Sequence, residues 1–322
     1  MKKMYIVLTM DCEPSRGTTH PLATGPEDWT VGENAVCGYS EIASRYGFPV
    51  TLFVHPETAI AQAAMFRDLE QHGACLGLHM HPWKYSRWRY NGSRYHAHYG
   101  GLSEAEQLAL LAESSALWQD AIGRRPSYFR PGTFSANDAI FRVLDSLGFK
   151  GGSCTAPGRV IPEMCAVWSG AEPDPHLANA VFRQIAGDLS FVNMPLSADR
   201  SVLLSGPSGR SMYADLRPDV DWLGQYQTSY KKIATNIVSQ VLKRDPDVPV
   251  LNTISHNQYA YRDSGDPVYQ RLQRMLDEVC AACSAANLEP VGVTLSDITN
   301  AVLLAPKRDI PFALEGAIFD KK

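Results

Sequence analysis

The segment Met4-Tyr-Ile-Val-Leu-Thr-Met-Asp-Cys-Glu13 opens the chain with an apolar, β-prone run that ends in two carboxylates. Residues i and i+2 of a strand point to the same side, so Asp11 and Glu13 can face one pocket. A second run, Leu76-Gly-Leu-His-Met-His-Pro-Trp83, carries His79 and His81 with the same spacing. Two carboxylates and two imidazoles, each pair at a strand end, have the composition of a metal site.

Working outward from these runs, apolar β-type segments alternate with amphipathic helical segments along the whole chain. The predicted strands cover 4–10, 49–55, 74–81, 127–130, 190–196, 249–256 and 290–294. The predicted helices cover 33–46, 59–72, 103–122, 136–147, 222–243 and 268–286. Such alternation predicts a parallel α/β fold.

Polar residues gather where the predicted strands end. In parallel sheets and barrels, reactive groups collect at the carboxyl ends of the strands. We therefore expect six side chains to meet at one end of the sheet. They are Asp11, Glu13, His79, His81, Arg130 and His256.

The overall composition is that of a soluble globular protein with a large core. Of the 322 residues, 45% are hydrophobic and 20% are charged. The net charge is −4 and the isoelectric point is about 6.1. These values give no electrostatic reason to expect nucleic acid or an anionic membrane as a partner.

The N-terminal run and the cysteines indicate a cellular compartment. Met-Lys-Lys precedes a short apolar run that Asp11 interrupts, with no small-residue cleavage site after it, so we interpret it as a strand and not a secretion signal. No apolar run approaches the roughly 18–20 residues of a membrane span. The seven cysteines are scattered and odd in number, which is typical of free thiols in a reducing compartment. We expect a cytoplasmic enzyme.

The domain organisation follows from the absence of a linker sequence. We expect a single catalytic domain over residues 1–322. Three stretches rich in small, turn-forming or polar residues are predicted to be long loops, at about 82–101, 154–187 and 198–221.

Four short motifs resemble a known family. Thr-Met-Asp-Cys-Glu (9–13), Leu-His-Met-His-Pro-Trp (78–83), Tyr-Phe-Arg-Pro-Gly-Thr-Phe (128–134) and Thr-Ile-Ser-His (253–256) follow the motif order of the NodB-homology polysaccharide deacetylases, carbohydrate esterase family 4. The resemblance spans about residues 4–300. It implies an incomplete, distorted (β/α) barrel of the polysaccharide deacetylase type. It also implies one divalent metal ion and hydrolysis of an N-acyl group, acetyl or formyl, from a sugar.

The resemblance also implies roles for individual residues. By it, Asp11 is the catalytic base, Arg130 orients that base, and His256 is the acid that protonates the leaving amine. Glu13, His79 and His81 are the implied metal ligands. Zinc is the expected metal, with cobalt, manganese and iron as alternatives, because all four accept mixed carboxylate and imidazole ligation.

Two departures from the family pattern leave alternatives open. The usual pair of adjacent aspartates is Asp11 and Cys12 here, so Asp11 and Glu13 could exchange roles, and Cys12 could be a thiolate ligand. The usual histidines stand four residues apart, whereas here one residue separates them. His96 and His98 are therefore alternative third ligands. For the aspartate that orients the acid histidine, Asp188 and Asp221 are both candidates.

The segment 83–99 mixes six aromatic with four cationic side chains directly after the expected ligands. Aromatic faces suit stacking on a sugar ring, and arginine suits phosphate. We expect Trp83, Arg87, Trp88 and Arg89 to bind substrate as part of a lid for a phosphorylated or nucleotide-linked amino sugar. The alternative for this loop is a solvated insertion or a contact in a homo-oligomer.

Three functions remain in competition. The leading one is a metal-dependent hydrolase that removes an N-acyl group from an amino sugar or a sugar-nucleotide-type substrate. A second is a different amidohydrolase acting on a C–N bond, but there the His-x-His pair ends the first strand. A third is an inactive carbohydrate-binding pseudoenzyme, against which the joint presence of Asp11, Arg130 and His256 argues.

Overall fold

The longest strand of the protein is its first, β1 (Lys2–Cys12), and the sheet is organised around it. The computed structural model describes residues 1–17, 24–206 and 209–305. Strand β1 pairs in parallel with β2 (Val50–Val54) on one side. On its other side it pairs in parallel with β12 (Val250–Asn252) and β13 (Ser255–His256). Strand β14 (Leu288–Gly292) pairs in parallel with the first half of β1, on the same side as β2, because Tyr5 and Ile6 pair with β12 and β14 at once. Near-continuous burial along β1 explains its apolar run, because both faces of a parallel sheet are covered.

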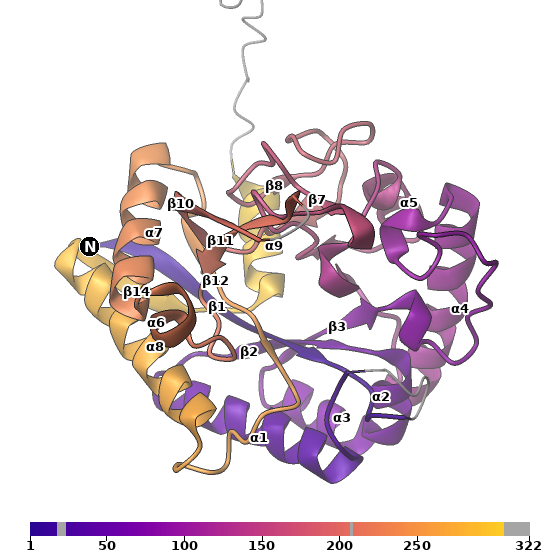
Figure 1. The fold of residues 1–322 in the computed structure, drawn as a ribbon, viewed down its shortest axis with the longest axis horizontal. Helices are drawn as coiled ribbons and strands as arrows, with labels where there is room; N and C mark the ends of the chain where they lie inside the picture. Colours follow the sequence, from indigo (N-terminus) through magenta and orange to yellow (C-terminus); the bar gives the residue numbers. More distant parts are fainter. Residues whose placement is uncertain (18–23, 207–208, 306–322) are drawn as a thin grey trace, which may run out of the picture.

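Beyond β2 the parallel sheet continues through β3 (Cys75–Met80), β4 (Tyr128–Pro131), β5 (Gly151–Gly152) and β9 (Val192–Asn193). The short β8 (His176–Leu177) closes this side in the antiparallel direction. The sheet curls into a half-barrel with helices around its outside (Figure 1). The expected distorted (β/α) barrel is confirmed.

Helices connect the strands much as the sequence predicts. They are α1 (Trp29–Arg45), α2 (Pro56–Ala61), α3 (Ala63–Gln71), α4 (Glu104–Ile122), α5 (Ile140–Ser146), α6 (Trp222–Tyr226), α7 (Tyr230–Arg244), α8 (Pro267–Ala285) and α9 (Leu295–Leu304). The predicted helices 59–72 and 222–243 are each two helices, and α9 was not predicted. The capping box of Ser103 and Glu106 at the start of α4 is confirmed. In the described part of the chain, every helix is too short or too polar to cross a membrane.

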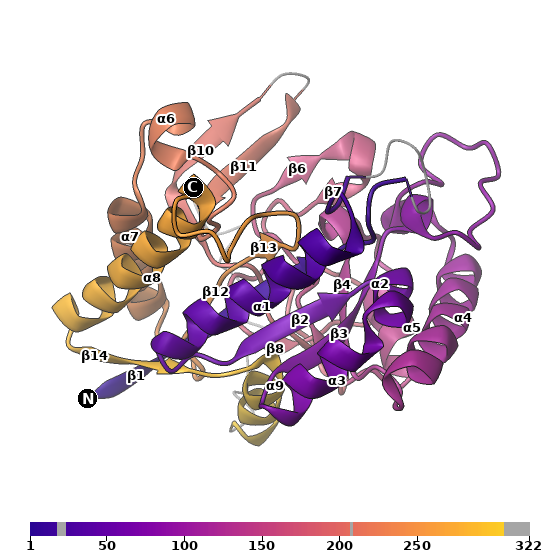
Figure 2. The ribbon, with the colours of Figure 1, turned by 90° about the horizontal axis from the view of Figure 1, so that it is seen from below.

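The prediction of a loop over 198–221 was wrong in its first part. Residues Ala198–Ser205 and Ser211–Asp215 are the antiparallel strands β10 and β11, which join the short strands β6 (Val160–Ile161) and β7 (Ala166–Val167) in a second sheet. This hairpin lies beside α6 at the upper edge of the view in Figure 2. Much of β10 is exposed, so its sequence lacks the apolar alternation by which half-buried strands are recognised.

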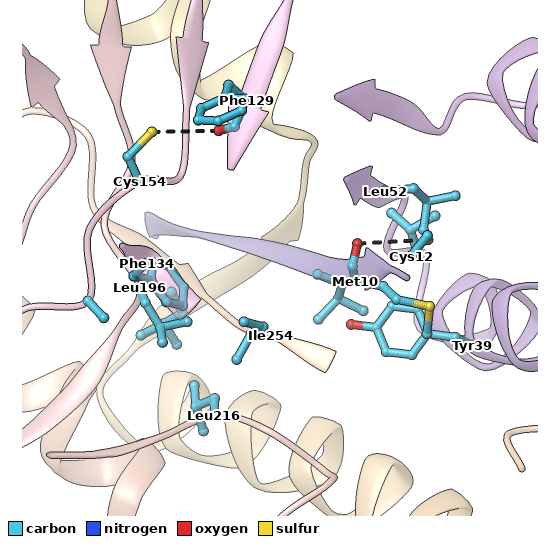
Figure 3. Close-up of a cluster of buried hydrophobic side chains, with 14 of the residues drawn as sticks. Met10, Cys12, Tyr39, Leu52, Phe129, Phe134, Cys154, Leu196, Leu216 and Ile254 are labelled. Carbon is cyan, nitrogen blue, oxygen red and sulfur yellow. Dashed lines mark hydrogen bonds between the residues drawn. The ribbon is translucent and has the colours of Figure 1, made fainter. Parts of the chain in front are cut away.

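The core packs against the convex and concave faces of the sheet, and it contains Cys12. This thiol is fully buried beside Leu52 and Tyr39 in the cluster of Figure 3. Its neighbours in sequence, Asp11 and Glu13, point to the opposite side, as the two-residue period requires. Burial raises the pKa of the Cys12 thiol well above its usual value. Among the described residues, the group of ligand-type side chains consists of Glu13, His79 and His81 and does not include Cys12, which favours Glu13 over Cys12 as the ligand from β1.

Candidate metal and catalytic site

Three ligand-type side chains converge where β1 and β3 end. The ligand atoms of Glu13, His79 and His81 all lie within 4.8 Å of one another. Oε1 of Glu13 is 3.3 Å from Nε2 of His79 and 2.9 Å from Nε2 of His81. All three side chains are buried. One carboxylate oxygen and two imidazole nitrogens facing one point form a donor set that fits zinc or a similar divalent cation.

A hydrogen bond of Nδ1 fixes the orientation and the tautomer of the His79 ring. Nδ1 lies 3.0 Å from the carbonyl oxygen of Arg130 on the neighbouring strand β4. Since only an N–H can donate to that carbonyl, Nε2 carries the lone pair that faces the cluster. His81 is also held neutral, because burial lowers its pKa to about 3. The two rings meet edge to face with centroids 4.9 Å apart.

Lys84 is an unexpected member of this cluster. It lies in the 3-10 turn Pro82–Lys84, is 2% exposed, and places Nζ 3.0 Å from Oε2 of Glu13. The same ammonium donates to the carbonyl oxygen of Thr24 at 2.8 Å. Burial alone would raise the pKa of Glu13, but the Nε2 contact of the neutral His81 ring and the charge of Lys84 outweigh it and hold that pKa well below its usual value. Lys84 therefore occupies one carboxylate oxygen and leaves Oε1 to the histidines.

Asp11 is held by Arg130 across the end of the sheet. Nη1 of Arg130 donates to Oδ1 of Asp11 at 2.8 Å, and Nη2 donates to the hydroxyls of Thr9 and Ser153. Both partners are buried. Burial alone would raise the pKa of Asp11, but the guanidinium and nearby imidazoles outweigh it and the pKa is lowered. Oδ2 of Asp11 faces Nε2 of His79 at 3.8 Å, so the ionised carboxylate borders the ligand cluster.

His256 lies directly across from Asp11 in the pairing of β1 with β13. Its Nδ1 is 2.6 Å from Oδ2 of Asp219, a buried side chain in the loop after β11. Burial alone would lower the pKa of His256, but Asp219 outweighs it and the pKa is raised. A quarter of the ring (26%) is exposed, so Nε2 can reach a substrate.

The prediction that Asp188 or Asp221 orients His256 was wrong, because Asp219 is the carboxylate that contacts this histidine. Asp221 instead caps α6 by accepting from the backbone N–H of Gly224, and Asp188 is exposed. Asp219 is not distinguished from Asp221 by any local sequence pattern, because both lie in the same segment predicted to be a loop. Asn257 was missed as well. Its side chain accepts from the N–H of Glu13 at 2.9 Å and donates to the carbonyl of Glu13 at 3.0 Å, which ties the end of β1 to β13.

The two alternative histidines do not join the described cluster. His96 is buried next to α4, with Nε2 3.0 Å from Oε1 of Glu106 and Nδ1 accepting from the N–H of Asn91. Since both ring nitrogens have partners, His96 lacks a free lone pair for a metal. His98 is half-buried and also stands outside the three-residue group. The structure favours His81 as third ligand.

The residues expected to bind substrate have different surroundings. The Trp83 ring lies beside His81, with centroids 6.1 Å apart. Trp88 stacks on His96 at 4.6 Å and donates Nε1 to the carbonyl of that residue. Arg87 is exposed and reaches Glu113 of α4 at 3.5 Å, and Arg89 is exposed. Of the four, Trp83 is the one that contacts a member of the ligand cluster.

Gly132 makes room for the His81 ring, which leads to a first prediction. A Cβ at residue 132 would lie 2.1 Å from Nδ1 of His81, inside any possible contact. We expect Gly132→Ala to displace this ligand and to lower the free energy of unfolding by about 1–3 kcal/mol, as overpacking does. Thermal unfolding and metal content measure both effects. Gly265→Ala is the control, because its Cβ would meet only a side-chain oxygen of Asp263, at 3.2 Å; equal behaviour of the two variants would contradict the argument.

Comparison with known proteins agrees with this geometry. The profile of the family described as polysaccharide deacetylase matches residues 25–152, a range that contains His79, His81 and Arg130 and begins after Glu13. Over that range the chain is similar to the polysaccharide deacetylases. No curated protein sequence matches it.

Several solved structures have a similar fold at low sequence identity. A Mycobacterium smegmatis protein assigned to the polysaccharide deacetylases is 17% identical with a TM-score of 0.57, covering 94% of this chain and 91% of that one. The allantoinase Puue is 14% identical with a TM-score of 0.54, covering 92% of this chain and 89% of that one. A Pseudomonas aeruginosa PAO1 protein assigned to the same family is 13% identical with a TM-score of 0.54, covering 92% and 90%.

Proposed function

We propose that this protein is a metal-dependent hydrolase that removes an N-acyl group, acetyl or formyl, from an amino sugar or a sugar-nucleotide-type substrate. The observation that carries the proposal is the convergence of Glu13, His79 and His81 beside the Asp11–Arg130 pair. The match of residues 25–152 to the polysaccharide deacetylase family supports the same reaction type. The retention of a complete donor set speaks against an inactive binding protein.

The proposed division of roles follows from the contacts. Glu13, His79 and His81 would hold one divalent cation, which when bound would supply the charge that activates water and polarises the acyl carbonyl. Asp11 takes the proton of the attacking water, because it is ionised and borders the cluster. Arg130 keeps Asp11 charged and oriented.

His256 completes the proposed mechanism as the general acid. Its raised pKa favours the imidazolium form, and its partly exposed ring can give a proton to the departing amine. Asp219 fixes the ring through Nδ1 and leaves Nε2 as the donor. We further propose that Trp83, next to His81, stacks on the sugar ring, with Arg87, Trp88 and Arg89 farther out in the same loop.

Zinc is the metal we propose, with cobalt, manganese and iron compatible with the same donors. We also propose a reducing, cytoplasmic setting for the enzyme. The seven cysteines, all within the described residues, are free thiols, which supports that setting.

A second candidate function is hydrolysis of a C–N bond in a small cyclic amide. It is supported by the similar fold of an allantoinase. The same water activation by metal and base would serve it. Assays of released acetate or formate from N-acyl sugars, run beside ring-opening of allantoin, distinguish the two candidates.

Metal content per chain tests the proposed function. We expect about one equivalent of divalent metal per chain in the wild type and nearly none in His79→Ala. Removal of one of the three protein ligands should abolish most of the affinity of the site for the metal. His72→Ala, at an exposed histidine on the surface after α3, should keep the wild-type content. A wild type that takes up no zinc or cobalt after supplementation would overturn the proposal.

Lys84 gives a prediction specific to this chain. Its buried ammonium contacts Glu13, so it repels any cation that the same carboxylate binds. Two unit charges about 4 Å apart interact by roughly 4 kcal/mol at an effective dielectric constant near 20, which exceeds the usual gain from orienting a ligand. Lys84→Gln keeps an N–H donor but removes the charge, and we expect it to tighten zinc binding at least tenfold in competition with a chelating dye.

The matched variant for this measurement is Lys84→Arg, which keeps the positive charge. It should not tighten zinc binding. If Lys84→Gln weakens binding instead, Lys84 acts mainly by orienting Glu13, and the electrostatic argument is wrong.

A further inference from the structure

A buried arginine near the site has no neutralising partner of its own. Arg159 has a side chain only 11% exposed, and its closest carboxylate oxygen, Oδ2 of Asp215, is 3.8 Å from Nη2. That distance is too long for a hydrogen bond. Among the described residues, none accepts a side-chain hydrogen bond from Arg159. A mostly buried guanidinium with open donors is costly unless another group completes it.

Asp215 is already committed to a different arginine. Arg217 donates from Nε and Nη2 to the two carboxylate oxygens of Asp215, the bidentate arrangement that arginine favours. Two cations thus share one buried carboxylate, which leaves a local positive charge. Burial and the nearby Arg217 lower the pKa of Arg159 to about 10, so it still carries that charge at neutral pH.

The backbone presents Arg159 rigidly toward the catalytic side of the protein. Its N–H donates to the carbonyl of Ala156 at 3.0 Å, and its carbonyl accepts from Trp168 at 2.7 Å. Its guanidinium carbon lies 4.9 Å from the Phe134 ring centre, and that of Arg130 lies 5.5 Å from the same ring. Phe134 thus contacts both Arg159 and the arginine that holds Asp11. Arg159 is therefore separated by one aromatic ring from the arginine that holds the proposed catalytic base.

We propose that Arg159 binds an anionic oxygen group, carboxylate or phosphate, on the substrate, so that the protein acts on an acidic N-acyl sugar. This inference rests on the proposed function for the identity of the sugar, but not for the anion site itself. The guanidinium fork matches both oxygen groups. Arg159 is better placed than Arg87 to bind an anion of the substrate, because the Arg87 guanidinium contacts Glu113 on the surface of α4.

Anion binding is tested first without any reaction. Inorganic phosphate is titrated by calorimetry into the wild type, Arg159→Gln, Arg159→Lys and Arg142→Gln, all with equal metal content. We expect Arg159→Gln to weaken binding at least tenfold and Arg159→Lys to weaken it less, because a lysine keeps the charge but not the fork. Arg142→Gln removes an exposed surface arginine paired with Glu104 and should bind as the wild type does. Equal phosphate affinity in the wild type and Arg159→Gln overturns the proposal.

Thermal unfolding separates a binding role from a structural one. If Arg159 binds ligand, removing its uncompensated charge in Arg159→Gln should leave Tm unchanged or raise it. Arg217→Gln, by contrast, should lower Tm, because it leaves Asp215 buried without its bidentate partner. A lowered Tm in Arg159→Gln with unchanged phosphate affinity would make Arg159 a structural partner of Asp215 and would also overturn the proposal.

Substrate pairs then identify the source of the anion. Methyl N-acetylglucosaminide is compared with its 6-phosphate and with the corresponding 6-carboxylate, by release of acetate. We expect kcat/KM to favour one acidic member over the neutral sugar, and Arg159→Gln to reduce that preference at least tenfold. If no sugar is hydrolysed but phosphate binding still depends on Arg159, the proposed function fails and the anion site stands. If the wild type and Arg159→Gln both hydrolyse the neutral sugar with a higher kcat/KM than the acidic sugars, and to the same extent, the anion site is contradicted while the proposed function stands.

Discussion

Asp11→Asn should lower kcat/KM for release of the acyl group by about 10²–10⁴ while leaving the metal content close to that of the wild type. The reason is the geometry of the carboxylate. Oδ1 accepts from Arg130 at 2.8 Å, and Oδ2 borders the ligand cluster, 3.8 Å from Nε2 of His79. An asparagine can still accept the hydrogen bond of Arg130, but it cannot take a proton from water.

Glu13→Gln is the matched variant, because it changes the other carboxylate of β1 in the same way. Oε1 of Glu13 lies within 3.3 Å of both histidines, so this variant should lose most of its metal as well as its activity. Elemental analysis beside the rate measurement therefore separates a base from a ligand. Loss of metal from Asp11→Asn, with metal kept in Glu13→Gln, would show that the two acids have exchanged roles.

Stability has to be followed in the same experiment. Arg130 is fully buried, and removing the charge of its partner can cost up to about 3–5 kcal/mol, the range for a broken buried ion pair. Circular dichroism and thermal unfolding of Asp11→Asn show whether the folded fraction is complete at the assay temperature. Thr9 and Ser153 also accept hydrogen bonds from Arg130, which should keep the guanidinium in place.

Sequence analysis could find those parts of the site that depend on local geometry. The two-residue period of a strand predicts that Asp11 and Glu13 share one side while Cys12 faces the core, and the structure agrees. The parallel register explains why ends that are distant in sequence meet, since Asp11 pairs with His256 and His79 pairs with Arg130.

The parts that were missed depend on contacts that no local pattern encodes. Lys84 looks like one more cation in a basic loop, and only the turn Pro82–Lys84 directs it inward to Glu13. Asp219 sits in a short loop after a hairpin whose first strand is largely exposed, so neither the hairpin nor the loop has a hydrophobic period. Side chains that come from irregular segments are positioned by tertiary structure, which a single sequence does not display.

Substitutions of His256 and Asp219 should have the second large effect on the rate of hydrolysis. His256→Gln should lower kcat by about 10²–10⁴, because the leaving amine loses its proton donor. A more specific result is expected for Asp219→Asn, which keeps the shape of the side chain and removes its charge. Its pH profile should differ from that of the wild type on one side only.

The direction of that change follows from the pKa of each group. His256 acts in its protonated form, which is lost as the pH rises through its pKa, so it sets the alkaline limb of the profile. Asp219 raises that pKa, so Asp219→Asn should move the alkaline limb to lower pH. Asp11 acts in its ionised form and sets the acid limb, which lies low because the pKa of Asp11 is lowered, and that limb should stay in place.

Asp221→Asn is the control, because Asp221 is only two residues away and caps α6 instead of contacting His256. Asparagine also caps helices well, so both stability and the pH profile should match the wild type. Rates for the three proteins are measured across the pH range at saturating and at limiting substrate. An alkaline limb that stays in place in Asp219→Asn would remove Asp219 from the mechanism, since the 2.6 Å contact with Nδ1 would then have no effect on the acid. An equal shift in Asp221→Asn would show that the change does not depend on that contact.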